Sequence, residues 1–195
     1  MNNTDERHDE GRTDYRGRSI CFYHPNGRGS GSALRIEPRV NRHDEDRYNC
    51  FFIEMASQKS TAKRDRAAGD FATFDWDNKI TVKLGFLDIC EMLIVLEGRA
   101  PHVGGDRKGL YHASGTSNTL ISCSRDAERG TYYLSLSRKR KGDTEAQRIG
   151  IGLSEAEATG LRSLFQTGLF FVTFSSALKS RRIERGPCEA GTRAA

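Results

Sequence analysis

The residues of this sequence most suited to binding a ligand are aromatic and basic side chains that alternate with apolar ones. In the segment 131–137, Tyr132 and Leu134 share one side of an extended chain and Tyr133 takes the other. A basic run follows at once, Arg138-Lys139-Arg140-Lys141. Exposed rings stack on unpaired bases at about 1 to 3 kcal/mol each, while neighbouring cations follow the phosphates. The pattern therefore predicts a surface for single-stranded nucleic acid.

Two further segments repeat the alternation. In the segment 48–55, Phe51 and Ile53 share one side and leave Phe52 on the other side with Tyr48. In the segment 79–84, alternate apolar residues leave lysines on the reverse face. The candidate phosphate contacts from these patterns are Lys79, Lys83, Arg138, Lys139, Arg140 and Lys141. The candidate stacking residues are Tyr48, Phe52, Trp76 and Tyr133.

Other interpretations of the same alternation stay open. The reverse faces could simply be solvated, or Phe52 and Tyr48 could be buried in a subunit contact of a structural oligomer. An enzyme or small-molecule binder is a third possibility, and a closed pocket between sheets that held His112 or His102 with a carboxylate would favour it.

Sequence motifs for catalysis are missing. The chain has no Gly-x-Ser-x-Gly and no His-Glu-x-x-His, and the alternating glycines at 27, 29 and 31 lack the Lys-Ser or Lys-Thr of a phosphate loop. The five histidines share no metal-ligand spacing. We therefore expect no enzyme, no catalytic residue, no metal site and no cofactor.

The length of 195 residues predicts one domain with polar ends. We expect a disordered polar arm at 1–17, a domain at 18–175 and a basic disordered tail at 176–195. Five cysteines without a Cys-x-x-Cys pair favour a reducing compartment. No apolar run is long enough to cross a bilayer, and the first residues do not resemble a signal peptide. These features favour a cytoplasmic protein with no membrane partner.

Periodicity predicts an α+β fold with antiparallel sheets in the order ββββα-ββββα. Helices are expected at 86–96, before Gly98, and from Ser154 to Phe174, where Ser154 and Glu157 form a capping box. The predicted strands are 19–23, 33–37, 48–55, 71–84, 109–113, 119–123, 131–137 and 147–151.

Five short blocks, in order, resemble motifs of the Whirly proteins, which are single-stranded DNA-binding regulators. Gly31-Ser32-Ala33-Leu34-Arg35-Ile36-Glu37-Pro38-Arg39 is similar to a second-strand motif that reads Lys-Gly-Lys-Ala-Ala-Leu and then Glu-Pro-Arg. Phe74-Asp75-Trp76-Asp77-Asn78-Lys79 resembles Tyr-Asp-Trp-Ser-x-Lys. The remaining three blocks are Tyr111-His112, Tyr132 to Leu136, and Leu153 to Glu157.

The resemblance covers roughly residues 18 to 174 and implies two packed antiparallel four-stranded sheets with two helices. It implies that helices join protomers into a homotetramer, with single-stranded nucleic acid lying along sheet surfaces between subunits. The motif's lysines are replaced by serines here, so Arg28 and Arg35 become the nearby basic candidates. The group includes kinetoplastid mitochondrial guide-RNA-binding proteins, so an RNA-binding or annealing protein is the alternative. We expect a single-stranded DNA-binding protein of low sequence specificity in DNA maintenance or transcription regulation.

Overall fold

A computed structural model of the chain describes residues 19–39, 49–62 and 71–174. The first sheet contains β1 (Ile20–His24), β2 (Ser32–Arg39), β3 (Cys50–Ser60), β4 (Thr73–Phe74) and β5 (Ile80–Leu84). All of its pairs are antiparallel, in the order β1-β2-β3, and β4 and β5 share the remaining side of β3.

The second half of the chain repeats this plan. Helix α1 (Phe86–Leu96) and a 3₁₀ turn, η3 (Gly105–Arg107), lead into an antiparallel sheet of the order β6-β7-β8-β9, and α2 follows. The elements are β6 (Leu110–Ala113), β7 (Ser117–Asp126), β8 (Thr131–Arg140), β9 (Gln147–Leu153) and α2 (Glu155–Phe174). The predicted α+β class, with two antiparallel sheets and two helices, is confirmed.

One predicted strand, 71–84, is instead two strands with a turn between them. The carboxylate of Asp75 accepts hydrogen bonds from the backbone and the side-chain amide of Asn78, at 3.4 and 2.8 Å. Such an Asx turn reverses the chain locally and ends strand pairing. The preceding strand is longer than expected, because β3 continues to Ser60 and pairs there with β4.

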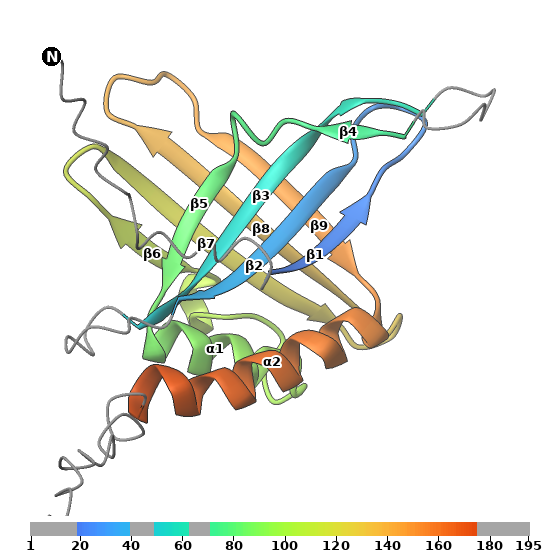
Figure 1. The fold of residues 1–195 in the computed structure, drawn as a ribbon. Coiled ribbons are helices and arrows are strands. Elements are labelled where there is room, and N and C mark those ends of the chain that lie inside the picture. The colour runs from blue at the N-terminus through green and yellow to red at the C-terminus, as the bar shows by residue number, and fades with distance from the viewer. Residues whose placement is uncertain (1–18, 40–48, 63–70, 175–195) are drawn as a thin grey trace, which may run out of the picture.

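The two sheets pack face to face across one hydrophobic core, and Figure 1 shows them crossing, with both helices beneath the same end. The core side of each strand follows the predicted alternation: Phe51, Ile53, Leu134 and Leu136 are fully buried. Because side chains alternate along a strand, each sheet also has an outward face. We call these the sheet-one face (β1 to β5) and the sheet-two face (β6 to β9).

Helix α2 begins with the predicted capping box. The backbone N–H and the hydroxyl of Ser154 donate to one carboxylate oxygen of Glu157, and the Glu157 N–H donates to the Ser154 hydroxyl at 3.3 Å. Further along, Gly168 is buried where a β-carbon would lie 2.1 Å from the Phe51 ring. The helix can therefore approach the first sheet closely only because this residue has no side chain.

Both helices carry exposed apolar side chains. Phe86 and Leu87 on α1 are 48% and 75% exposed, and Phe170, Phe171 and Phe174 on α2 are also exposed. The two helices are antiparallel neighbours, with Gln166 of α2 bonded to Glu97 just after α1. No helix among the described residues has the length and apolar character that crossing a membrane requires.

Candidate nucleic-acid interface

Three rings form a cluster on the sheet-one face. The Tyr23 ring of β1 lies 5.4 Å from the Phe74 ring and 6.5 Å from the Trp76 ring, measured between centroids. Tyr23 is 52% exposed, while Phe74 and Trp76 are half-buried. Ring pairs at these separations attract each other and hold each other in place. The cluster thus offers a fixed aromatic surface with Tyr23 as its most exposed member.

The Tyr23 hydroxyl stays uncharged near neutral pH. A hydrogen bond with Cys21, followed by burial, raises the pKa of Tyr23 above its ordinary value. A neutral phenol does not repel a phosphate, so this ring can approach a nucleic-acid strand without an electrostatic cost.

A network of charged side chains lies beside this cluster. Arg35, Glu54 and Thr81 stand opposite one another on β2, β3 and β5. The Glu54 carboxylate is 3.4 Å from Arg35 Nη1 and 2.8 Å from Lys79 Nζ, and it accepts a hydrogen bond from the Thr81 hydroxyl at 3.1 Å. The Arg35 guanidinium also lies 4.2 Å from the centroid of the Trp76 ring. This network joins charge and rings into one unit.

A second set of basic and aromatic residues lies at the other end of the same face. Phe52 is half-buried, with the Arg39 guanidinium 5.1 Å from its ring centroid, and Arg39 pairs with Glu37 at 3.1 Å. Lys83 lies directly opposite Phe52 on β5. Phe52 is therefore on the predicted outward side and is not wholly buried within the protomer.

The glycine-rich turn between β1 and β2 presents Arg28. The Asn26 side chain accepts hydrogen bonds from the backbone of Arg28 and Ser30, and buried Gln58 accepts two more from Asn26 and Gly31. A β-carbon at Gly31 would lie 2.3 Å from the His24 carbonyl oxygen, so glycine is required there. The turn is built by these bonds, and Arg28 is exposed at its tip.

The sheet-two face carries the other predicted ring. Tyr133 is 52% exposed, and its hydroxyl would lie 2.1 Å from a β-carbon at Gly150, so its ring crosses the neighbouring strand β9. Lys139 is exposed on the same side of β8, while Arg140 and Lys141 are exposed where the strand ends. The predicted outward register of Tyr133 agrees with the structure.

Arg138 differs from its basic neighbours. It shares the core side of β8 with Leu134 and Leu136, donates to the carbonyl of Thr81 on β5, and donates to the Thr119 hydroxyl at 3.2 Å. Burial, and then the charge of Arg140, lower the pKa of Arg138. Alternation explains the difference, because an even-numbered residue of this strand points inward. Its hydrogen bonds join the two sheets, and it does not share a face with Tyr133.

The predicted set is thus divided between two faces that point away from each other. Arg35, Phe52, Trp76, Lys79 and Lys83 lie on or beside the sheet-one face, and Tyr133 and Lys139 lie on the sheet-two face. Tyr48 lies outside the described residues.

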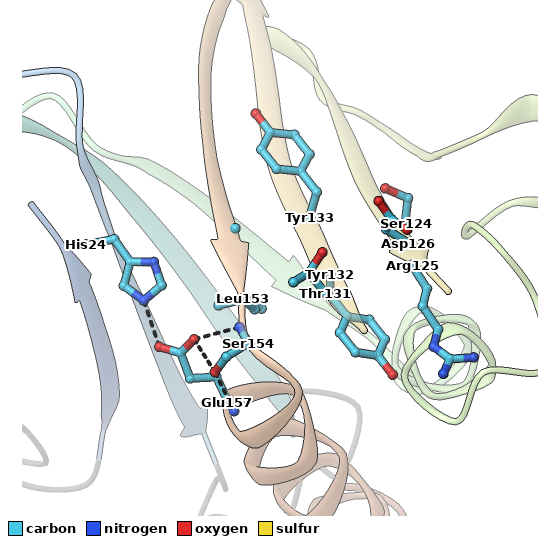
Figure 2. Close-up of a pocket in the computed structure, with 11 residues that line it drawn as sticks. His24, Ser124, Arg125, Asp126, Thr131, Tyr132, Tyr133, Leu153, Ser154 and Glu157 are labelled. Atoms are coloured by element: carbon cyan, nitrogen blue, oxygen red, sulfur yellow. Dashed lines mark hydrogen bonds and ion pairs between the residues drawn. The ribbon is translucent and has the colours of Figure 1, made fainter. Parts of the chain in front are cut away.

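A hollow of about 610 Å³ lies where the ends of β1, β7, β8 and β9 meet the start of α2. Figure 2 shows the His24 ring and the Glu157 carboxylate turned toward each other, at 2.7 Å, while Tyr132 and Tyr133 leave β8 in opposite directions. Burial alone would raise the pKa of Glu157, but hydrogen bonds from Ser154 and His24 lower it below its ordinary value. The contact between His24 and Glu157 therefore links the start of α2 to the end of β1.

The histidines considered for catalysis lie elsewhere. The His112 ring is 3.0 Å from Asp88, whose other carboxylate oxygen accepts the Gly85 N–H at the start of α1. His102 forms an isolated bridge with Ser124. Neither histidine lines the hollow. Among residues 19–39, 49–62 and 71–174, no cluster of three or more His, Cys, Asp or Glu could hold a metal ion.

Tyr23, Phe74 and Glu54 belong to the candidate interface and are not among the residues predicted from the sequence. Tyr23 alternates with Phe22, which packs against the core, so its outward position was visible in the period of the first strand. Phe74 lies two residues before Trp76, in the block 74–79 that resembles a Whirly motif. Glu54 gave no such signal, because its two cationic partners come from segments distant in sequence.

Comparison with known proteins shows the fold. No protein-family model and no curated protein sequence matches this chain. WHY3 from Arabidopsis thaliana superimposes with a TM-score of 0.61 at 18% identity, over 82% of this chain and 90% of that one. The plant transcriptional regulator PBF-2 gives 0.59 at 17% identity, over 86% and 89%. Trypanosome MRP1/MRP2 gives 0.54 at 19% identity, over 81% and 87%. This chain therefore has a Whirly-like fold.

Proposed function

We propose that this protein binds single-stranded nucleic acid, and DNA in particular, along the sheet-one face. The observation that carries the proposal is the ring cluster of Tyr23, Phe74 and Trp76 on one exposed sheet surface, with the exposed basic side chains Arg28 and Lys83 toward its two ends. Rings that stack on bases and cations that neutralise phosphates are the two parts such a surface needs. The structural similarity to the plant transcriptional regulator PBF-2 supports a role in transcription regulation.

Low sequence specificity follows from the type of contact. Every base has a π face, so stacking on Tyr23 or Phe52 does not depend strongly on base identity. A sheet face of this kind favours single strands, because the bases of a duplex are stacked on one another and out of reach. We infer a role in DNA maintenance or transcription regulation, in the cytoplasm, without catalysis.

RNA is the second candidate, because rings that stack on bases and cations that neutralise phosphates serve either nucleic acid. The 2′-hydroxyl group is the chemical difference that a protein can recognise. Competition between DNA and RNA oligonucleotides of the same sequence for one binding site decides between them. We expect the DNA strand to bind more tightly.

The exposed helical phenylalanines support a homotetramer. Phe170 is 5.8 Å from Phe171 and 5.6 Å from Phe174, between ring centroids, so these rings form one apolar patch on α2. A large exposed apolar patch is a typical subunit contact. A tetramer would also allow the sheet-one face of one protomer and the sheet-two face of its neighbour to contact one strand. Light scattering should give four times the chain mass; a stable monomer at micromolar concentration would rule this assembly out.

The test of the proposed function is an electrophoretic binding assay. A labelled dT oligonucleotide and a duplex of equal length are each titrated with the full chain at the same salt concentration. We expect a shifted complex with the single strand at a protein concentration at least tenfold below that required for the duplex. Equal affinity for both, or no complex with either, contradicts the proposal.

A further inference from the structure

Glu54 is an acidic side chain at the centre of a face that we propose binds a polyanion. The residue is 9% exposed, and its Oε2 atom is buried without a hydrogen-bond partner. A buried carboxylate is costly unless cations compensate for its lost hydration. Arg35 and Lys79 supply that compensation, at 3.4 and 2.8 Å.

The ion pair with Glu54 restrains the Arg35 side chain. Its guanidinium lies between the Glu54 carboxylate and the Trp76 ring, 4.2 Å from the ring centroid. Only 30% of the Arg35 side chain is exposed. The cation is therefore held by an ion pair on one side and a cation–π contact on the other. These two contacts hold the Arg35 guanidinium against the Trp76 ring, so it is poorly placed to follow a phosphate.

Lys79 is also held by Glu54. Its ammonium group lies against the Glu54 oxygen that also accepts the Thr81 hydroxyl, and its side chain is 33% exposed. A phosphate that recruited Arg35 or Lys79 would leave the buried Glu54 carboxylate with only one of its two compensating cations. Truncating one partner of such a pair is typically strongly unfavourable, and recruiting that partner elsewhere carries a similar penalty.

We propose that Glu54 is the residue that makes the sheet-one face select single strands over duplex. It retains Arg35 and Lys79 within the protein, so the centre of the face offers rings to bases and little net charge to phosphates. A single strand can use the rings, whereas a duplex offers only its phosphates. This inference rests on the proposed function and names the group that determines its specificity.

The test is the variant Glu54→Gln, which preserves the shape of the side chain and removes its charge. Each released cation that gains a phosphate of duplex DNA should raise affinity about eightfold at 0.1 M salt and steepen the log–log salt slope by about 0.9. For a single strand, the gained phosphate contact is offset because the Trp76 ring, no longer held by Arg35, stacks less well on a base, whereas a duplex does not use this ring. We therefore expect the affinity for a single strand to change within about twofold. The preference for single strands should therefore fall about eightfold if one of the two cations gains a phosphate, and further if both Arg35 and Lys79 do.

Two control variants separate charge from structure. Thr81→Val removes a hydrogen bond to the same carboxylate but no charge, and Glu128→Gln removes the same charge from the exposed turn before β8. Both should leave the preference for single strands within about twofold of the original chain. If Glu128→Gln weakens the preference as much as Glu54→Gln does, general charge is responsible and the inference is wrong.

Arg35→Gln provides a measurement that does not depend on the folding of the Glu54 variant. If Glu54 retains Arg35, the salt slope for a dT oligonucleotide should be unchanged; a decrease of about 0.7 would show a direct phosphate contact and overturn the inference. Failure of the unaltered chain to bind a single strand would instead refute the proposed function. Unaltered preference in Glu54→Gln, with normal binding by the original chain, would refute only the role of Glu54.

Discussion

Two glycines in α2 should respond to the same substitution in opposite directions. Gly160 is exposed, and a β-carbon there would meet nothing within 4 Å. Gly168 is buried, and a β-carbon there would lie 2.1 Å from one Phe51 ring carbon and 2.5 Å from another. Alanine favours a helix by about 1 kcal/mol over glycine at either position. Only Gly168 opposes this gain with a steric clash.

The size of the clash follows from the surroundings of Phe51. The ring is fully buried and lies edge-on to Phe165 at 5.4 Å between centroids, so it has little freedom to move aside. Overpacking of a core typically costs about 1 to 3 kcal/mol. After the helix gain is subtracted, Gly168→Ala should lower the free energy of unfolding by about 1 kcal/mol, while Gly160→Ala should raise it by about the same amount.

Thermal unfolding followed by circular dichroism measures both changes. For a domain of this size, 1 kcal/mol corresponds to roughly 2 to 4 °C in Tm, so the variants should differ by roughly 4 to 8 °C. In a Phe51→Leu background, Gly168→Ala should become neutral or stabilising, because the smaller side chain leaves room. An equal rise in Tm for both single variants would refute the close packing of α2 against β3.

Three further predictions concern the interface, the helix cap and a thiol. Lys139→Ala should reduce the single-strand salt slope by about 0.7, measured from binding isotherms at several salt concentrations, because one phosphate contact is lost. Glu157 has a lowered pKa, so its stabilising effect over Gln should be complete above pH 4.5 and disappear as the pH falls through that lowered value, measured by urea unfolding. Burial raises the pKa of Cys123 to about 12, so labelling of the native protein by iodoacetamide should leave Cys123 unmodified, as mass spectrometry can check.

The periodic parts of the fold were predictable from the sequence because burial imposes its period on the side chains. The alternation of Tyr132 and Leu134 with Tyr133 indicated which side of β8 faces the core, and the structure agrees. The Ser154 and Glu157 pair is a local contact three residues apart, so the start of α2 could also be read directly. The break at Asp75 was missed because the apolar pattern continues across the turn, although Asp and Asn are typical turn residues.

The candidate site was less predictable, because it depends on which strands become neighbours. Arg138 stands in a basic run of the sequence, and only the packing of β8 against β5 of the other sheet shows that its side chain joins the two sheets. The assembly of Tyr23, Phe74 and Trp76 also depends on pairing, since β1 and β4 lie on opposite sides of the β2–β3 pair. No spacing within one segment encodes such a contact.

The intrinsic fluorescence of Trp76 is the most direct test of whether single-stranded nucleic acid lies on the sheet-one face. The chain has one tryptophan, and it lies in the ring cluster of that face. Titration with a dT oligonucleotide should quench this fluorescence in a saturable manner, with the same midpoint as the electrophoretic assay, whereas a duplex should have little effect. Tight binding of the oligonucleotide with no change in Trp76 fluorescence would contradict the account, because the strand would then lie on another surface.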